Sequence, residues 1–176
     1  MFFDNDKSDA EVRADLEKKL WDGLGSSSPF VMLGLQGVED SRTRPMSVQI
    51  DEQDGKKTIY FFADKRENLV EAIGERHRAL ATFVNKGHDI FAHIHGDLVI
   101  DNDRAVIDRL WGPMIAPWFE DNKENPNLTL LRFDTKTANI WLAGGAEHLV
   151  KAALEAFGRD VEPPSYEDKR ADVELS

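Results

Sequence analysis

The stretch from Arg44 to Asp64, RPMSVQIDEQDGKKTIYFFAD, predicts two antiparallel strands joined by a polar turn. Apolar residues alternate with polar ones over 46–50, as in a strand with one buried face. The turn contains Asp54-Gly55, and the chain then returns in an apolar run, Thr58–Ala63. We therefore expect a β-hairpin, with Arg44 standing where its first strand begins. Arg44 is either a solvated strand end or a group that binds an anion.

Similar patterns recur along the chain and predict further strands. The longest alternation is IFAHIHGDLVI, Ile90–Ile100, in which every second residue forms an apolar face. Shorter apolar runs predict strands at Phe30–Leu35, Leu80–Val84, Leu128–Phe133 and Ala138–Leu142, with a turn at Asp134–Lys136 between the last two. This hairpin-like order favours an antiparallel barrel or a strongly curved sheet.

Helices are fewer than strands and are expected at the periphery. Ser8 and Glu11 have the spacing of a capping box before a helix at Asp9–Asp22. Further helices are predicted at Glu67–Glu75, directly after Asp103, and at Ala146–Phe157. The fold class is therefore α+β, mainly antiparallel β. We expect one domain over residues 1–158 and a polar, flexible tail over 159–176.

Composition excludes several classes of function. The 176 residues carry a formal charge of -11, which repels nucleic acid and anionic membrane surfaces. The chain has no cysteine, so disulfides, thiolate nucleophiles and cysteine-ligated metals are excluded. The N-terminal residues are acidic and lack the pattern of a secretory signal, so a cytoplasmic location is expected.

Few motifs point directly to chemistry. The sequence has no glycine-rich phosphate loop, no G-x-S-x-G elbow and no H-E-x-x-H pair, and no residue is identified as a catalytic acid or base. His93 and His95 lie two residues apart, so they share one face of a strand and could hold a metal ion. The alternative is a pair of histidines on a solvent or interface face, because no third ligand has a suggestive spacing. We therefore predict no metal site.

Four segments together resemble a known family. They are RPM at 44–46, IYFFAD at 59–64, HGDLVIDNDRAVIDRLWGP at 95–113 and ANIWL at 138–142. In this order they resemble the bacterial general stress protein branch of the pyridoxamine 5'-phosphate oxidase-like family. The resemblance implies a split β-barrel that binds FMN, with two flavin sites at the interface of a homodimer. It does not imply the oxidation of a vitamin B6 compound.

The resemblance also implies roles for particular residues. Arg44 would bind the FMN phosphate, and a second set would line the flavin ring or lie close to it: Pro45, Met46, Ser47, Phe61, Phe62, Ala63 and Trp111. In the alternative interpretation Arg44 is a strand-end charge and the apolar members are ordinary core. Trp111, Trp118 and Trp141 exceed what a small barrel readily buries, so we expect some of them at the dimer interface.

The phosphate end of the expected site departs from the family pattern. Where flavin-binding relatives tend to have threonine, serine and lysine, this chain has Ala63, Glu67 and Leu69. Lys65 or Arg66 could replace the missing cation. The resemblance therefore leaves two functions open: a flavoprotein oxidoreductase with a small electron acceptor, or a non-catalytic stress protein that binds FMN weakly, another flavin or another ligand.

Overall fold

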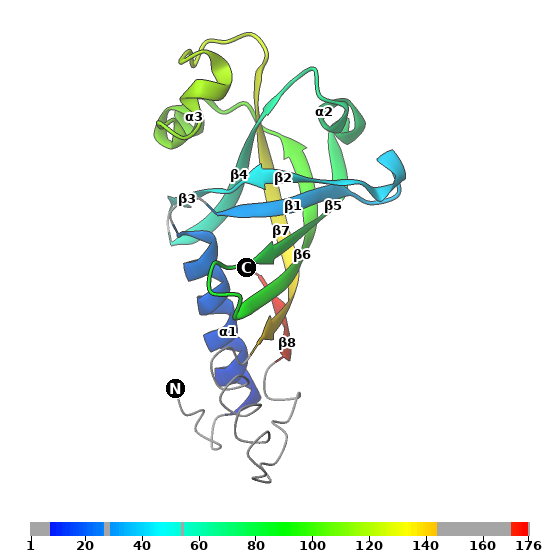
Figure 1. The fold of residues 1–176 in the computed structure, drawn as a ribbon, viewed down its shortest axis with the longest axis vertical. Helices are drawn as coiled ribbons and strands as arrows, with labels where there is room; N and C mark the ends of the chain where they lie inside the picture. The colour runs from blue at the N-terminus through cyan, green and yellow to red at the C-terminus, as the bar shows by residue number, and fades with distance from the viewer. Residues whose placement is uncertain (1–7, 27–28, 54, 144–169, 176) are drawn as a thin grey trace, which may run out of the picture.

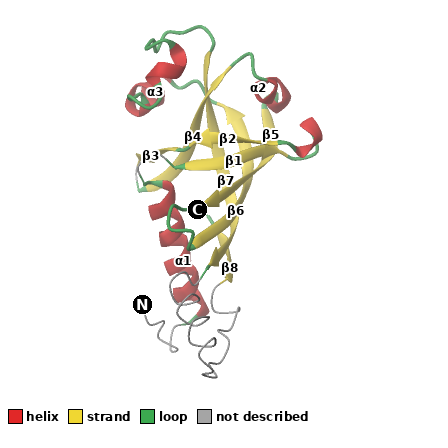
Figure 2. Cartoon of the chain, viewed as in Figure 1, coloured by secondary structure: helices red, strands yellow, loops and turns green. Residues whose placement is uncertain are grey.

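The computed structural model describes residues 8–26, 29–53, 55–143 and 170–175 (Figures 1 and 2). Within these residues, eight strands form one sheet in which every strand pair is antiparallel. The elements in chain order are α1 (Asp9–Leu24), β1 (Phe30–Leu35), the 3-10 turn η1 (Glu39–Ser41), β2 (Thr43–Ser47), β3 (Gln49–Gln53), β4 (Lys56–Asp64), α2 (Asn68–Ile73), β5 (Arg76–Val84), β6 (Ile90–Ile100), α3 (Arg104–Leu110), the 3-10 turn η2 (Ala116–Phe119), β7 (Leu128–Leu142) and β8 (Arg170–Glu174).

The sheet closes into a barrel because the two strands that flank Val48 pair with different neighbours. β2 pairs with β1 at one end of the strand order β2-β1-β5-β6-β7-β4-β3, and β3 pairs with β4 at the other end. The predicted hairpin is confirmed between β3 and β4, but its first strand is shorter than expected. Val48 is 4% exposed, and its backbone N–H donates to the carbonyl of Pro29 at 3.1 Å instead of pairing with either neighbouring strand.

The prediction of two strands separated by a turn at Asp134–Lys136 is wrong. β7 runs without interruption over 15 residues and pairs with β6 on both sides of a β-bulge. The register shifts between His95 and Gly96, so that β7 accommodates one extra residue there. Gly96 permits this close approach, because a Cβ at this position would collide with the carbonyl of Asp134. A bulge bends a strand without ending it. Polar residues at a bulge therefore give the same local sequence pattern as a turn between two strands.

The expectation of a flexible tail over 159–176 fails at 170–174, which form β8. This strand pairs with β7: Glu174 stands opposite Thr137 at one end of the ladder, and Arg170 stands opposite Trp141 at the other. Val173 and Leu175 are 7% and 8% exposed and belong to the main core. Alternating apolar residues in an otherwise polar segment explain the strand, since one face can be buried while the other stays in water. The predicted helix at 146–157 lies outside the described residues.

The helices lie at the periphery, as predicted for a split barrel with peripheral helices. α1 runs beside the lower parts of β6, β7 and β8, while α2 and α3 lie at the opposite end of the sheet (Figure 1). The predicted capping box of α1 is confirmed, because the backbone N–H of Ser8 donates to Glu11 at 2.8 Å and Glu11 N–H donates to the Ser8 hydroxyl. The helix buries Leu16, Leu20 and Leu24 at 2% exposure or less.

Two apolar clusters hold the fold together. The main core fills the barrel and extends to α1, whereas a smaller cluster lies under α3 and η2 around Phe119 and Leu130. Among the described helices, none combines the length and the apolar character needed to cross a membrane.

Candidate functional site

Arg44 lies at the start of β2, and its guanidinium is already paired. It stands opposite Leu33 in the register, and partners in a ladder share one face of the sheet, so Arg44 is on the side of the core. Its Nη2 donates to Glu39 Oε2 at 2.8 Å, and the two side chains are 23% and 15% exposed. The structure therefore presents Arg44 as a half-buried cation held by a carboxylate of the preceding loop.

Glu39 belongs to a turn whose backbone is strained. Glu39, Asp40 and Ser41 have φ values of 52°, 54° and 55°, all in the left-handed region. L-residues other than glycine occupy this region at a cost of about 1–2 kcal/mol each. Ser41 N–H donates to the Val38 carbonyl at 2.8 Å, and Arg42 N–H donates to the Glu39 carbonyl at 3.1 Å. In the sequence, Glu39 has no signal beyond being an acidic residue in the loop that leads to Arg44.

The residues expected to line the flavin ring fall on two sides of the strands. Met46 stands opposite Val31 and packs against the main core, whereas Pro45 is exposed and stands opposite Met32. Ser47 stands opposite Phe30. Only Pro45 and Ser47 of β2 therefore belong to the outer side of the barrel, where they adjoin the exposed side chains of β1.

The same division applies to β4. Phe61 and Ala63 are 0% and 7% exposed within the main core, and the ring of Phe61 lies 6.3 Å from that of Phe133. Phe62 points to the other side, where its ring is 6.0 Å from that of Trp111 in an edge-to-face arrangement. For Phe61 and Ala63 the structure shows core packing. Phe62 and Trp111 form a half-buried aromatic pair beneath α3.

At the expected phosphate end, the residues differ in whether they present a charged side chain that is free to contact a phosphate. Leu69 is 1% exposed in the main core, and Glu67 is exposed at the N-cap of α2. Arg66 donates to both carboxylate oxygens of Asp64, at 2.9 and 3.1 Å from its Nε, and these bonds lower the pKa of Asp64 to about 2. Lys65 is exposed, and its side chain has no polar partner among the described residues. Of the two candidate replacement cations, Lys65 is the one that is available.

The outer side of the barrel carries an exposed apolar surface. Phe30, Met32, Val84 and Phe91, which we call the apolar face, are 53%, 40%, 45% and 39% exposed. Val84 and Phe91 are partners in the β5–β6 ladder, and Phe91 in turn stands opposite Trp141 of β7. Met32 stands opposite Thr82 of β5, two residues before Val84, so the four side chains share one side of neighbouring strands. An exposed apolar surface of this kind is typical of an interaction site.

His93 and His95 lie on this same outer side of β6. The His93 ring is 5.3 Å from that of Trp141, edge to face, and Arg170 covers Trp141 at 5.2 Å. No cluster of three or more histidine and acidic side chains suited to a metal ion occurs in the part of the chain that the structure describes.

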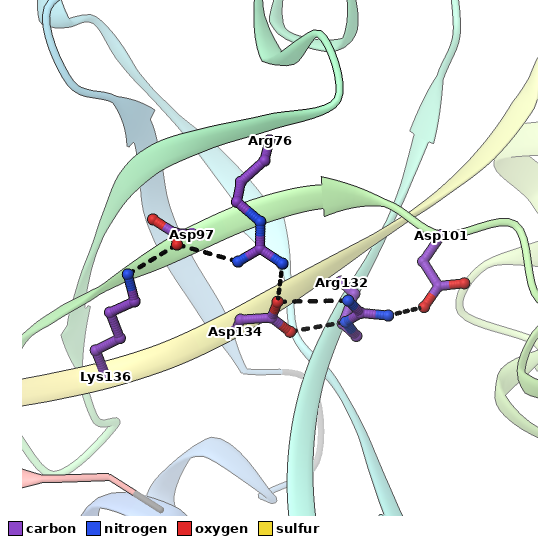
Figure 3. A network of polar contacts seen from close by, with 6 residues as sticks. All are labelled: Arg76, Asp97, Asp101, Arg132, Asp134 and Lys136. Atoms are coloured by element: carbon purple, nitrogen blue, oxygen red, sulfur yellow. Dashed lines mark hydrogen bonds and ion pairs between the residues drawn. The ribbon is translucent and has the colours of Figure 1, made fainter.

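A charge network crosses β5, β6 and β7 next to the bulge (Figure 3). Asp97, 7% exposed, accepts hydrogen bonds from Lys136 at 2.8 Å and from Arg76 at 3.1 Å, and the bond from Lys136 is the main cause of its lowered pKa. Arg76 also donates to Asp134, which together with Asp101 accepts from Arg132. Three carboxylates balance three cations. The network therefore connects β5, β6 and β7 around the bulge and leaves none of these six charges unpaired for a ligand.

Comparisons with known proteins agree with this architecture. The family model for proteins like pyridoxamine 5'-phosphate oxidase matches residues 15–162. No curated protein matches the chain.

Among solved structures, a general stress family protein from Xanthomonas campestris pv. campestris is 44% identical, with a TM-score of 0.69 over 78% of this chain and 92% of that one. The general stress FMN/FAD binding protein from Xanthomonas citri is 46% identical, with a TM-score of 0.67 over 73% of this chain and 89% of that one. A general stress protein from Jannaschia is 28% identical, with a TM-score of 0.74 over 92% and 99% of the two chains.

The split barrel, the family model and these similarities lead to one assignment. The chain belongs to the pyridoxamine 5'-phosphate oxidase-like family, in its general stress protein branch.

Proposed function

We propose that this chain is a flavin-binding protein and that FMN is its flavin. The observation that carries the proposal is the 46% identity to the Xanthomonas citri protein, which is described as an FMN/FAD binding protein. The half-buried guanidinium of Arg44 fits the group, because a planar cation with several donors suits a phosphate.

The residues present fit a flavin ring better than they fit its phosphate. Pro45 and Ser47 on the outer side of β2 would contact the ring, beside the exposed side chains of Met32 and Phe30. For the phosphate, the chain offers Arg44 and the exposed Lys65, while Leu69 contributes no charge from the core. We therefore expect FMN to bind more weakly than in relatives that have the additional lysine and hydroxyls, and another flavin can compete.

The apolar face supports a second part of the proposal, a homodimer with the flavin sites at its interface. Phe30 and Met32 adjoin the β2 residues assigned to the ring, so a partner that covers them would also enclose the ligand. Trp118 is 82% exposed on η2 and is a further candidate for burial in the dimer. We further propose that the protein is cytoplasmic and, with a net charge of -11, does not bind nucleic acid or membranes.

Redox chemistry in such a site belongs to the flavin, while the protein supplies binding, orientation and electrostatics. A reaction with a small electron acceptor would make the protein an oxidoreductase. A second candidate function is non-catalytic binding of a flavin or another ligand. It is favoured by one observation, the ion pair that already occupies Arg44.

A titration with FMN, FAD and riboflavin, followed by flavin fluorescence, tests the proposal. We expect saturable binding of FMN and weaker binding of riboflavin, which has the ring but no phosphate. Binding of none of the three would refute the proposed function. Anaerobic reduction of the bound flavin, followed by addition of candidate acceptors, then separates an oxidoreductase from a binding protein.

A further inference from the structure

The cation assigned to the ligand phosphate is already paired with a carboxylate. Nη2 of Arg44 donates to Glu39 at 2.8 Å, and both side chains are mostly shielded from water. A phosphate that approaches the same guanidinium would meet the Glu39 carboxylate at close range, where like charges repel strongly under reduced dielectric screening. The Glu39 carboxylate therefore competes with a phosphate for Arg44.

The turn that carries Glu39 is suited to move. Its three residues keep positive φ values, and the contacts that support them among the described residues are two backbone hydrogen bonds, the Arg44 pair, the exposed pair of Asp40 with Arg42 and the packing of Val38 against the core. Once the Arg44 pair is broken, the strained backbone can relax to ordinary conformations. Loss of one contact is thereby coupled to a local conformational change.

We propose that Glu39 competes with the ligand's phosphate for Arg44, so that phosphate binding displaces Glu39 and releases the η1 turn. This inference rests on the proposed function, because it assumes that Arg44 binds the phosphate. The apparent affinity equals the intrinsic affinity multiplied by the fraction of molecules in which Arg44 is available. If the pair is closed in about nine molecules of ten, the competition weakens FMN binding about tenfold. Riboflavin has no phosphate and is insensitive to it.

The test compares Glu39→Gln with Asp40→Asn, two variants that remove one negative charge from adjacent residues. Asp40 pairs with Arg42 at 3.5 Å, and both side chains are largely exposed, at 88% and 76%, so it serves as the matched control. FMN and riboflavin affinities are measured for each variant and for the wild type. Hydrogen exchange over residues 37–44 is measured with and without saturating FMN, and thermal unfolding verifies that each variant is folded.

We expect Glu39→Gln to bind FMN about tenfold more tightly, with riboflavin affinity unchanged, and Asp40→Asn to change FMN affinity less than twofold. In the wild type, FMN should accelerate exchange at 39–42. If the wild type binds FMN while Glu39→Gln shows no gain and exchange is unaltered, the competition is refuted and the proposed function stands. An equal gain in Asp40→Asn would also refute it, because a general charge effect would then explain the result. Failure of every protein to bind FMN would refute the proposed function and this inference with it.

Discussion

Replacing Arg44 with alanine tests its structural and its binding roles in one variant. In the free protein the change leaves Glu39, 15% exposed, without its cation. A buried acceptor deprived of its partner costs about 1–3 kcal/mol, and a fully buried charge costs more, but the remaining exposure of Glu39 favours the lower half of that range. For a chain of this size, about 1–2 kcal/mol corresponds to a fall of roughly 2–8 °C in Tm. FMN binding should weaken by a further loss of about 1.5–3 kcal/mol, which is roughly 10- to 150-fold in Kd.

A second variant separates the two effects. In the double change Arg44→Ala with Glu39→Ala no orphan carboxylate remains, so much of the lost stability should return while FMN affinity stays low. Calorimetry without ligand and fluorescence titration with FMN measure the two quantities independently. Unchanged Tm in Arg44→Ala would show that the pair contributes nothing to the fold. Full FMN affinity in the double variant would refute the assignment of Arg44 to the phosphate.

Three further predictions concern other parts of the molecule. Asp97→Asn should lower the free energy of unfolding at neutral pH and make that free energy less dependent on acid. The reason is that a carboxylate with a depressed pKa stabilises the fold above about pH 3.9 and loses this effect as the pH falls through the folded-state pKa. Unfolding curves from pH 7 to 2 that coincide with those of the wild type would contradict this prediction. The double change Glu67→Ser with Leu69→Lys should destabilise the ligand-free protein, because Leu69 is 1% exposed and a lysine there would bury a charge. The same change should tighten FMN binding about tenfold, or ~1.4 kcal/mol, because it removes a carboxylate and adds a cation at the expected phosphate end. An equal gain for riboflavin would show that the change acts on the ring. Phe91→Glu should shift the proposed dimer toward a 19.9 kDa monomer in light scattering, and an unchanged mass would locate the interface elsewhere.

Local patterns predicted most of the secondary structure because each element buries a periodic apolar face. The alternation over 90–100 gave β6 with its observed bounds, and the capping box gave the start of α1. The errors arose where long-range pairing overrides local signals. Val48 looks like the middle of one strand, but in the barrel it is the point where the chain changes partner. Polar residues at 134–136 look like a turn, yet neighbouring strands hold them in a bulge.

The candidate site was less predictable than the fold. The resemblance identified Arg44, but sequence alone could not show that Glu39 occupies it, since the pair depends on a loop with an unusual backbone. Strand alternation does separate Phe62 from Phe61 and Ala63, and the structure shows which side is the core. Leu69 stands where flavin-binding relatives tend to have lysine, whereas its burial depends on how α2 packs on the barrel.

The pairing of β8 has a consequence for how the molecule is made. α1 packs against β8, although synthesis of the chain separates these two segments by almost the whole barrel. Until the ribosome has produced 170–175, the part of the main core that Val173 and Leu175 cover stays exposed. Contacts of such long sequence separation form late and expose apolar surface in the meantime. A nascent chain stalled before residue 170 should therefore be a preferred client of chaperones, even though its barrel strands are already synthesised.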